Sequence, residues 1–339
     1  MRRLNKWTFA LILSVLGGVI LSASYLWAQQ PAPPPAPPAA APPATAGDQD
    51  EAPTFRADTR LVLVHASVLD KNGKLITDIP ESGFKVYENN VEQPIKIFRR
   101  EDVPVSMGII IDNSGSMSQK RSSVAAAALA LVKNSNPEDE VFIVNFSDDA
   151  YLDQPLTSSI KKLEQALDRL DARGGTAMRD ALGMSIDYVK DKGKKDKKVL
   201  MVITDGDDNA SNETLEQLVR KAQASEVLIY SIALLDDEVP RRAKNARRAM
   251  KELAEATGGV DFYPKTLGEV EQITPRIAHE IRNQYTIAYS PLNLQLDGTF
   301  RNIKVLVNGY GKPTVRTRNG YYASPAPPTK LQPSPNSKK

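Results

Sequence analysis

The chain has 339 residues, of which 41% are apolar and 25% are charged, so it is long enough for about two domains of ordinary globular composition. Its net charge of +3 is too small to favour nucleic-acid binding, and no basic stretch carries interleaved aromatic residues. The absence of cysteine excludes disulfides, thiol catalysis and zinc–thiolate sites.

The first segment of the chain is basic and then apolar, as in exported proteins. Arg2, Arg3 and Lys6 precede an uncharged apolar stretch that runs to Ala28. Residues 1–28 are interpreted either as a signal peptide or as an N-terminal membrane anchor, because the stretch is long enough to span a bilayer. Both interpretations predict an exported protein that is periplasmic, secreted or anchored to the membrane.

Proline and alanine dominate residues 29–53, which predicts a semi-rigid linker without a core of its own. Residues 54–103 are predicted to form the first half of a small β unit. Short alternating segments and an Asn72-Gly73 turn signal support this prediction. A unit of this length alone buries too little surface to be stable. The predicted strands are 59–69, 84–88 and 95–98.

Continuous apolar strands alternate with helical segments over residues 104–283. The strands are too apolar on both faces for an exposed sheet, so the pattern predicts a parallel sheet covered on both sides by helices. The predicted strands are 106–112, 140–146, 151–156 (a short edge strand), 199–204, 227–234 and 260–263. The predicted helices are 122–133, 160–170, 177–190, 213–224, 241–255 and 267–282.

The β pattern returns in residues 284–323, with predicted strands at 285–289, 303–307 and 314–318. These strands are too few for a domain of their own, so we expect them to pair with residues 54–103. The predicted fold class is therefore α/β: a doubly wound, mostly parallel sheet inserted in, or flanked by, a small β-sandwich built from both chain ends. Residues 324–339 are predicted to be a disordered tail.

Three loops at the predicted ligand-binding edge of the sheet carry small side chains with oxygen atoms. Asp112, Ser114 and Ser116 follow the first apolar strand, Thr176 follows two glycines, and Asp205 follows the fourth strand. Ligands of open α/β sheets bind at the carboxyl ends of the strands, so we expect these side chains to converge. Oxygen atoms are the ligands that magnesium and calcium prefer, which predicts a metal site.

Each loop also has an ordinary structural interpretation, as a turn or a helix cap. The three together, in this order and at predicted strand ends, favour the metal site. A second candidate, Asp205, Asp207, Asn209 and Glu216, superficially matches a calcium-binding EF-hand loop. Ala210 occupies the position where the sharp turn of that loop requires glycine, so we reject it.

The D-x-S-x-S loop, the Gly-Gly-Thr loop and the T-D-G segment together resemble a von Willebrand factor type A (VWA) domain with a metal-ion-dependent adhesion site (MIDAS). The resemblance covers the α/β region without a departure from the five-residue pattern. It implies that Ser114, Ser116 and Thr176 ligate the ion directly and that Asp112 and Asp205 act mostly through bound waters. The flanking β segments and the Pro-rich N-terminus resemble bacterial exported proteins related to this domain.

The resemblance implies a magnesium or manganese ion, with calcium less favoured. Neutral hydroxyls and waters leave the charge of such an ion largely unquenched, so an aspartate or glutamate of a partner can complete its coordination. The expected function is that of an exported, metal-dependent protein-binding or adhesion protein and not of an enzyme, because His65 and His279 are far in sequence from Ser114 and no nucleophile elbow surrounds that serine. Two alternatives stay open: a metal-dependent hydrolase and a structural, self-assembling envelope protein.

The predicted helix at 241–255 carries a run of basic residues that has two interpretations. It either faces an anionic partner or lipid surface, or is an ordinary solvated helix face, which is the commoner role of such runs. The acidic residues Asp236, Asp237 and Glu238 directly precede it and offer local pairing. The basic residues are Arg241, Arg242, Lys244, Arg247, Arg248 and Lys251.

Overall fold

The computed structural model describes residues 61–100, 102–133, 136–168, 174–235 and 240–324. These residues belong to one compact unit, which spans Ala57–Lys339. The predicted signal peptide or anchor, the predicted linker and all but the first residue of the predicted tail lie outside the described residues. Within the described part of the chain, no helix combines the length and the apolar composition that a membrane crossing needs.

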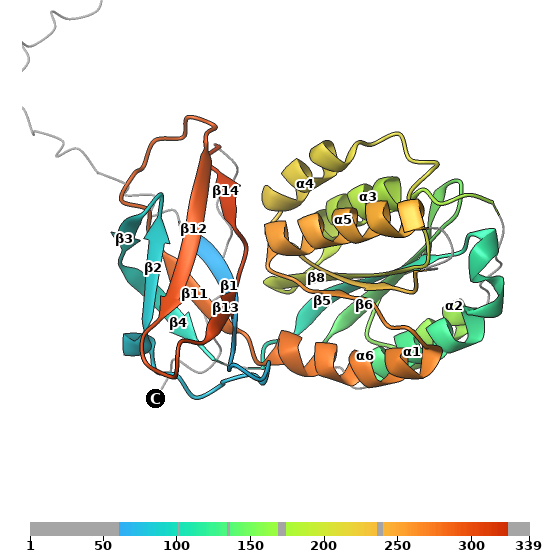
Figure 1. Ribbon diagram of the computed structural model, residues 1–339, viewed down its shortest axis with the longest axis horizontal. Coiled ribbons are helices and arrows are strands. Elements are labelled where there is room, and N and C mark those ends of the chain that lie inside the picture. Colours follow the sequence, from blue (N-terminus) through green and yellow to red (C-terminus); the bar gives the residue numbers. More distant parts are fainter. Residues whose placement is uncertain (1–60, 101, 134–135, 169–173, 236–239, 325–339) are drawn as a thin grey trace, which may run out of the picture. The chain divides into compact units, whose positions relative to one another are not determined.

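A six-stranded sheet in the order β10-β9-β8-β5-β6-β7 forms the middle of the α/β region (Figure 1). β5 pairs in parallel with β6 and β8, and β9 pairs in parallel with β8 and β10, whereas β7 runs antiparallel to β6. The chain builds the sheet first on one side of β5 and then on the other, so strand order reverses between β5 and β8. The strands are β5 (Val105–Asp112), β6 (Glu140–Phe146), β7 (Ala150–Thr157), β8 (Lys197–Thr204), β9 (Leu228–Ala233) and β10 (Asp261–Phe262).

Helices cover both faces of this sheet (Figure 1). Successive side chains of a strand point to opposite faces. Ile109 and Ile111 of β5 therefore belong to one core and Ile110 to the other. The first core is covered by α1 (Arg121–Lys133), α2 (Ile160–Leu167) and α6 (Leu267–Arg282), and the second by α3 (Met178–Lys192), α4 (Leu215–Gln223) and α5 (Pro240–Thr257).

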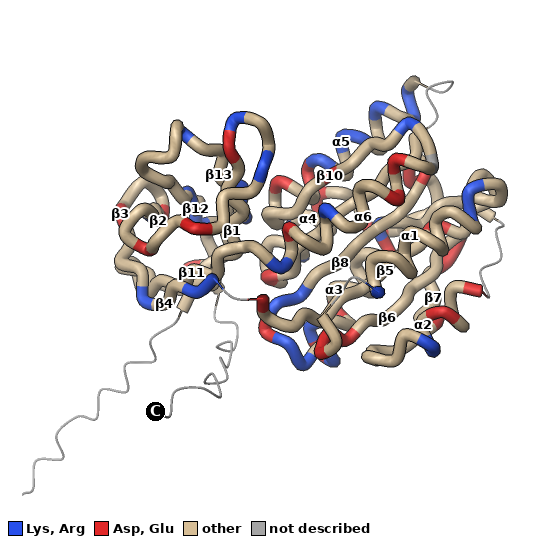
Figure 2. Tube along the Cα trace, turned by 90° about the horizontal axis from the view of Figure 1, so that it is seen from below, with Lys and Arg blue, Asp and Glu red and all other residues tan. Residues whose placement is uncertain are grey.

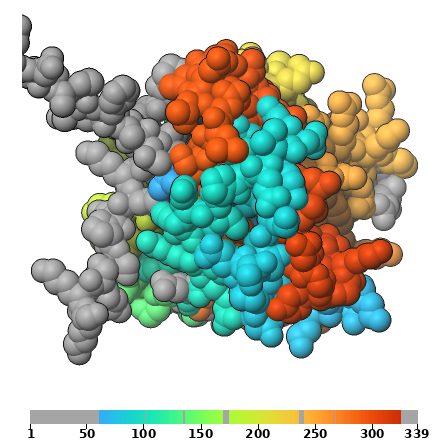
Figure 3. Space-filling view, turned by 90° about the vertical axis from the view of Figure 1, so that its left-hand side faces the viewer, coloured from blue at the N-terminus to red at the C-terminus, as the bar shows by residue number. Residues whose placement is uncertain are grey.

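Two four-stranded sheets, ordered β13-β1-β11-β4 and β14-β12-β2-β3, form a β-sandwich. Each sheet joins strands from before and after the α/β region: β11 lies between β1 and β4, and β12 pairs with β2. Figure 3 shows the cyan and orange-red segments side by side on this face. The strands are β1 (Val62–Leu69), β2 (Phe84–Glu88), β3 (Val91–Gln93), β4 (Ile95–Arg99), β11 (Tyr285–Tyr289), β12 (Phe300–Val307), β13 (Thr314–Arg316) and β14 (Gly320–Tyr322).

The predicted fold class is confirmed: a doubly wound, mostly parallel sheet accompanies a sandwich built from both ends of the chain. The domain boundaries stay predictions. Local differences have simple causes. The turn at Gly73 forms with φ +77°, but the chain after it returns only as an isolated bridge between Leu69 and Leu75. The short edge strand β3 was not predicted, because its three residues carry little pattern.

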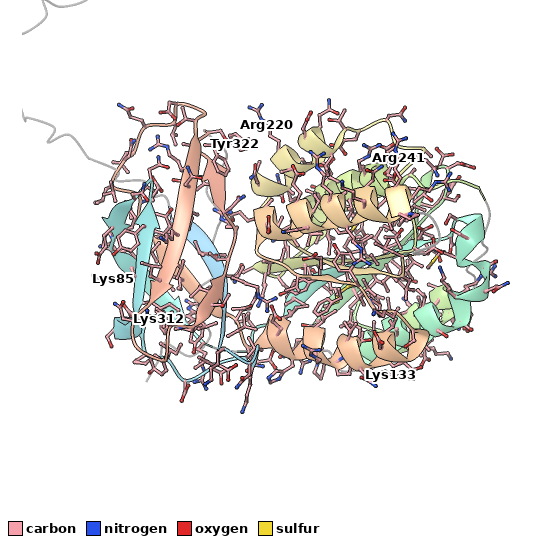
Figure 4. All side chains as sticks on the ribbon, in the orientation of Figure 1. Lys85, Lys133, Arg220, Arg241, Lys312 and Tyr322 are labelled. Carbon is pink, nitrogen blue, oxygen red and sulfur yellow. The ribbon has the colours of Figure 1, made fainter. Side chains whose placement is uncertain are left out.

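Polar contacts attach α6 and the central sheet to the sandwich. The Gln284 side-chain amide donates to the hydroxyls of Tyr230 (3.2 Å) and Ser67 (3.1 Å). Glu280 at the end of α6 accepts from Ser67 and forms an ion pair of 2.8 Å with Arg316. On the other side, Arg220 of α4 lies over the ring of Tyr322 of β14, at 4.9 Å from its centroid (Figure 4).

Candidate metal centre

A pocket of about 340 Å³ lies at the carboxyl edge of the central sheet, beside the point where strand order reverses. Four of the five predicted site residues line it: Ser114, Ser116, Thr176 and Asp205. They come from three loops that are far apart in the sequence, so the expected convergence occurs. The other lining residues are Lys120, Gly174, Gly175, Gly206, Asp207, Asn209, Leu235, Arg242 and Ala243.

Asp112, the fifth predicted residue, lies directly behind this pocket and is 1% exposed. One carboxylate oxygen accepts from the Ser114 backbone N–H at 2.8 Å, and the other accepts from the Thr204 hydroxyl at 2.5 Å. Burial raises the pKa of the Asp112 carboxyl, while the hydrogen bonds from Thr204 and Ser114 oppose that shift. Asp112 thus fixes the loop that follows β5 to the end of β8.

A chain of hydrogen bonds links the two serines to Asp205. The hydroxyls of Ser114 and Ser116 lie 3.1 Å apart, and the Ser116 hydroxyl donates to one oxygen of Asp205 at 2.8 Å. The other oxygen of Asp205 accepts from the Lys120 ammonium at 2.6 Å. The side chain of Asp205 is 2% exposed and that of Lys120 is 29% exposed. The carboxylate is therefore already neutralised by a cation of the chain itself.

The second loop is held in place through its backbone. The N–H of Gly175 donates to Asp148 at 2.7 Å, and the N–H of Thr176 donates to the Asn209 side chain at 3.0 Å. Gly174 has a φ of +82°, and a Cβ atom there would lie 2.4 Å from an Asp148 oxygen, so glycine is required. These contacts leave the Thr176 hydroxyl at the pocket, beside Gly206.

The chemistry of these donors fits a hard divalent cation. Hydroxyl and carboxylate oxygens suit magnesium, manganese or calcium, whereas zinc and copper sites usually include histidine or cysteine. Within the part of the chain that the structure describes, no group of three or more histidine, cysteine, aspartate or glutamate side chains could hold a metal ion, at this pocket or outside it. The pocket is the candidate metal centre because hydroxyl oxygens of Ser114, Ser116 and Thr176 add to the carboxylate of Asp205.

Neither the rejected EF-hand loop nor a catalytic role of the two histidines gains support from the geometry. Of the apparent EF-hand residues, Asp207 accepts from Asn245, and Asn209 accepts from the Thr176 N–H. His65 is buried in β1, where its ring lies 3.2 Å from the Thr286 hydroxyl, and burial lowers its pKa. Neither His65 nor His279 lines the pocket.

The sequence patterns did not single out three side chains that shape the site: Thr204 orients Asp112, Lys120 neutralises Asp205 and Asp148 fixes the second loop. Each contacts a residue distant in sequence, so no local pattern identifies it. Asn209, considered above only for the EF-hand loop, also fixes the second loop, and Arg242 of the basic run lines the pocket from α5.

Residues 107–207 match the family model described as von Willebrand factor type A domain. Mouse integrin alpha-11 is 34% identical over 102 residues, which are 28% of this chain and 8% of the integrin. The uncharacterized protein sll0103 of Synechocystis sp. is 26% identical over 139 residues, which are 40% of this chain and 33% of that protein. The chain thus spans about a third or less of the length of these curated relatives.

Among solved structures, a von Willebrand factor type A protein from Catenulispora acidiphila is similar, with a TM-score of 0.47 and 13% identity. The alignment covers 77% of this chain and 73% of that one.

Proposed function

We propose that this protein, whose central region is a von Willebrand factor type A domain, captures an acidic side chain of a partner protein through a divalent cation. Type A domains are commonly metal-dependent protein-binding or adhesion modules. One observation carries the proposal for this chain: oxygen-bearing side chains from three separate loops line a single pocket.

In this proposal Ser114, Ser116 and Thr176 hold the cation directly, and Asp112 and Asp205 act through bound waters. Magnesium or manganese is the expected ion. When bound, the cation supplies a positive charge with a coordination position open to a carboxylate. The chain's own part is to orient the hydroxyls and to restrain both aspartates, which the hydrogen bonds of the three loops support.

The proposed setting is the cell exterior or envelope. Residues 1–28 would direct export or anchor the chain, and residues 29–53 would separate the folded part from a membrane or a neighbour. Residues 104–283 would form the binding domain, carried by a sandwich of residues 54–103 and 284–323. The pairing of β1 and β4 with β11 supports a sandwich shared by the two flanking segments.

Binding is favoured over catalysis because the pocket offers few groups for proton transfer. Among the described residues that line it, none is a histidine or glutamate, and Asp205 is engaged by Ser116 and Lys120. A metal-dependent hydrolase predicts instead that ester or phosphate substrates are turned over and that EDTA abolishes this activity.

Calorimetric titration with Mg²⁺ and Mn²⁺ tests the site. We expect saturable binding to the wild type and at least about tenfold weaker binding to Asp112→Ala and Ser116→Ala, because each change removes a loop restraint or a ligand. Asp191→Ala is the control, since its carboxylate is exposed at the end of α3 and pairs with Lys192. Equal affinities for the wild type and both site variants would refute the assignment.

Capture from an envelope extract tests the partner. A protein retained with Mg²⁺, released by EDTA and lost with an Asp112→Ala bait supports metal-dependent binding. The structural alternative predicts oligomers that persist in EDTA and in Ser114→Ala.

A further inference from the structure

The first two turns of α5 present three basic side chains beside the candidate metal centre. Arg241, Arg242 and Lys244, here called the basic cluster, are exposed, and Arg242 lines the same pocket as Thr176 and Asp205. Figure 4 shows Arg241 at the end of α5 that is far from the β-sandwich, and Figure 2 shows Lys and Arg concentrated along this helix. The cluster thus extends the pocket with positive charge.

The later cations of α5 have partners. Arg247 lies over the Tyr263 ring at 4.4 Å from its centroid. Arg248 and Lys251 form ion pairs of 3.9 and 3.7 Å with glutamates one turn further on. For the basic cluster, in contrast, the structure gives no ion pair with any described residue.

Folding does not explain this placement of charge. Positive side chains in the first turn of a helix oppose the helix dipole, and α5 has no acidic residue in its first turn. α4 and α6 follow the favourable pattern, with Glu216 and Glu269 in their first turns. Arg241 and Arg242 in this first turn therefore gain no stabilisation from the dipole of α5, which favours a role of the basic cluster outside folding.

The acidic residues nearest to the pocket are already engaged. Asp205 pairs with Lys120, Asp207 accepts from the Asn245 side chain at 3.0 Å, and Asp208 forms an ion pair of 3.0 Å with Arg179. Asp205 and Asp208 are thus paired with cations, whereas Asp207 is bonded only to a neutral amide, so the three positive charges of the basic cluster exceed the unpaired negative charge of the described residues at this rim.

We propose that the partner of this site is an acidic protein segment with several carboxylates, of which one reaches the cation and others pair with the basic cluster. The proposal rests on the function proposed above and narrows it from a single acidic residue to an acidic run. A cation held by hydroxyl oxygens in a small pocket has room for one carboxylate of a partner, carried on a flexible side chain. Arginines at the rim suit neighbouring carboxylates, which they bind in a bidentate manner.

Two fluorescein-labelled peptides of equal length are the probes: one has a single aspartate among glycines and serines, and the other has four acidic residues. Fluorescence anisotropy with Mg²⁺ measures their binding. We expect the wild type to bind the four-acid peptide at least about tenfold more tightly, because each added rim contact contributes up to about fivefold. Raising the salt concentration is expected to remove most of this preference.

The chain offers a matched pair of variants. Arg241→Gln/Lys244→Gln removes two charges of the basic cluster, and Arg248→Gln/Lys251→Gln removes the same two residue types at the same spacing, about 10 Å further along α5. We expect the first variant, and Arg242→Gln alone, to bind the four-acid peptide about fivefold more weakly, and the second to change it less than about twofold. Mg²⁺ titration is expected to be unchanged in the two double variants, whose replaced residues do not line the metal pocket.

The outcomes separate this proposal from the proposed function. If the wild type binds Mg²⁺ but does not prefer the four-acid peptide, or if the basic-cluster variants keep the full preference, the acidic-run proposal is wrong and the metal site stands. Retained preference would also favour local pairing with Asp236, Asp237 and Glu238. Failure of the wild type to bind Mg²⁺ refutes the metal site itself. Equally tight binding of a single-stranded oligonucleotide in EDTA would overturn the acidic-run proposal in favour of a general polyanion surface.

Discussion

Both carboxylate oxygens of Asp205 accept hydrogen bonds, one from Ser116 and one from Lys120. The contact with the Lys120 ammonium competes with the binding of a metal ion at this carboxylate. This ammonium also lies 3.4 Å from the Leu234 carbonyl. An ammonium and a divalent ion are attracted to the same carboxylate. We therefore expect Lys120 to lower the affinity of the site for metal, because its charge competes for Asp205.

Replacing Lys120 by methionine keeps the length of the side chain and removes its charge. We expect Lys120→Met to bind Mg²⁺ about fivefold more tightly by calorimetry, since a partly exposed pair contributes up to about 1 kcal/mol. In EDTA we expect the free energy of unfolding to fall by about 1–3 kcal/mol, because the buried carboxylate of Asp205 loses its charged donor. Thermal denaturation with EDTA and with Mg²⁺ measures the second effect.

Lys133→Met is the control, because Lys133 pairs with Glu164 at 3.0 Å on an exposed surface of α1. It should alter neither quantity. Weaker Mg²⁺ binding by Lys120→Met would contradict the competition and would make Lys120 a support of the site.

Residue-level prediction succeeds where chemistry is local. Asp112, Ser114 and Ser116 lie within five residues of one another, so their spacing alone predicts them as site residues. The role of the Thr204 hydroxyl, which orients Asp112, cannot be predicted from local spacing. It reaches Asp112 because β5 and β8 pair in a register that aligns Ile111 with Ile203, and one sequence does not specify such a register.

The contact between β8 and α6 contains a buried lysine that makes stability depend on pH. Lys197 starts β8, is 2% exposed and donates to the Ile281 carbonyl in the last turn of α6. Burial lowers the pKa of Lys197 to about 7, although Asp102, Glu280 and Asp139 oppose the shift. The unfolded chain therefore binds more protons than the folded chain between about pH 7 and the ordinary lysine pKa.

Stability should consequently rise with pH across this window. Below about pH 7 the lysine is charged in both states and the cost of burying its charge is complete, whereas at higher pH the folded state holds it neutral. We expect the Tm of the wild type, relative to that of Lys197→Met, to increase from pH 7 to about 9.5, below the range in which tyrosines titrate. Thermal denaturation at several pH values measures the difference.

Lys198→Met provides the comparison at the next position of β8, where the side chain is only half-buried and bonds to the Lys195 carbonyl. Its Tm should follow that of the wild type at every pH. A Tm difference between the wild type and Lys197→Met that does not change with pH would show that the lysine titrates normally.

Elements were predictable where burial leaves a strong pattern. The strands of the central sheet are apolar on both faces, so most of their bounds were close to those observed. The helix predicted to continue to residue 170 ends at Leu167, and β12 begins at Phe300, earlier than predicted. Strand order could not be predicted, because it depends on contacts between distant segments that leave no periodic trace.

At the scale of the whole molecule, the sandwich depends on residues from both ends of the chain. Glu88 of β2 is 3% exposed, and one of its oxygens accepts from the hydroxyls of Tyr289 and Tyr321, each at 2.8 Å. Arg301 of β12 lies 3.7 Å from its other oxygen. The carboxylate thus joins strands that the α/β region separates in sequence. Sequence reasoning predicted this association from the shortage of strands in each half, but not the buried network.

Glu88→Gln keeps the shape of this side chain and removes its charge. We expect the free energy of unfolding to fall by about 1–3 kcal/mol. The NH₂ group of the amide must face either the Arg301 guanidinium, which is itself a donor, or the two tyrosine hydroxyls, which then lose their acceptor. Thermal denaturation measures this loss, and Glu92→Gln, at the exposed pair with Lys85, should lose much less. Mg²⁺ affinity should be unchanged in both, since neither residue lines the metal pocket. A loss of Mg²⁺ affinity in Glu88→Gln would instead show that the sandwich and the metal centre are energetically coupled.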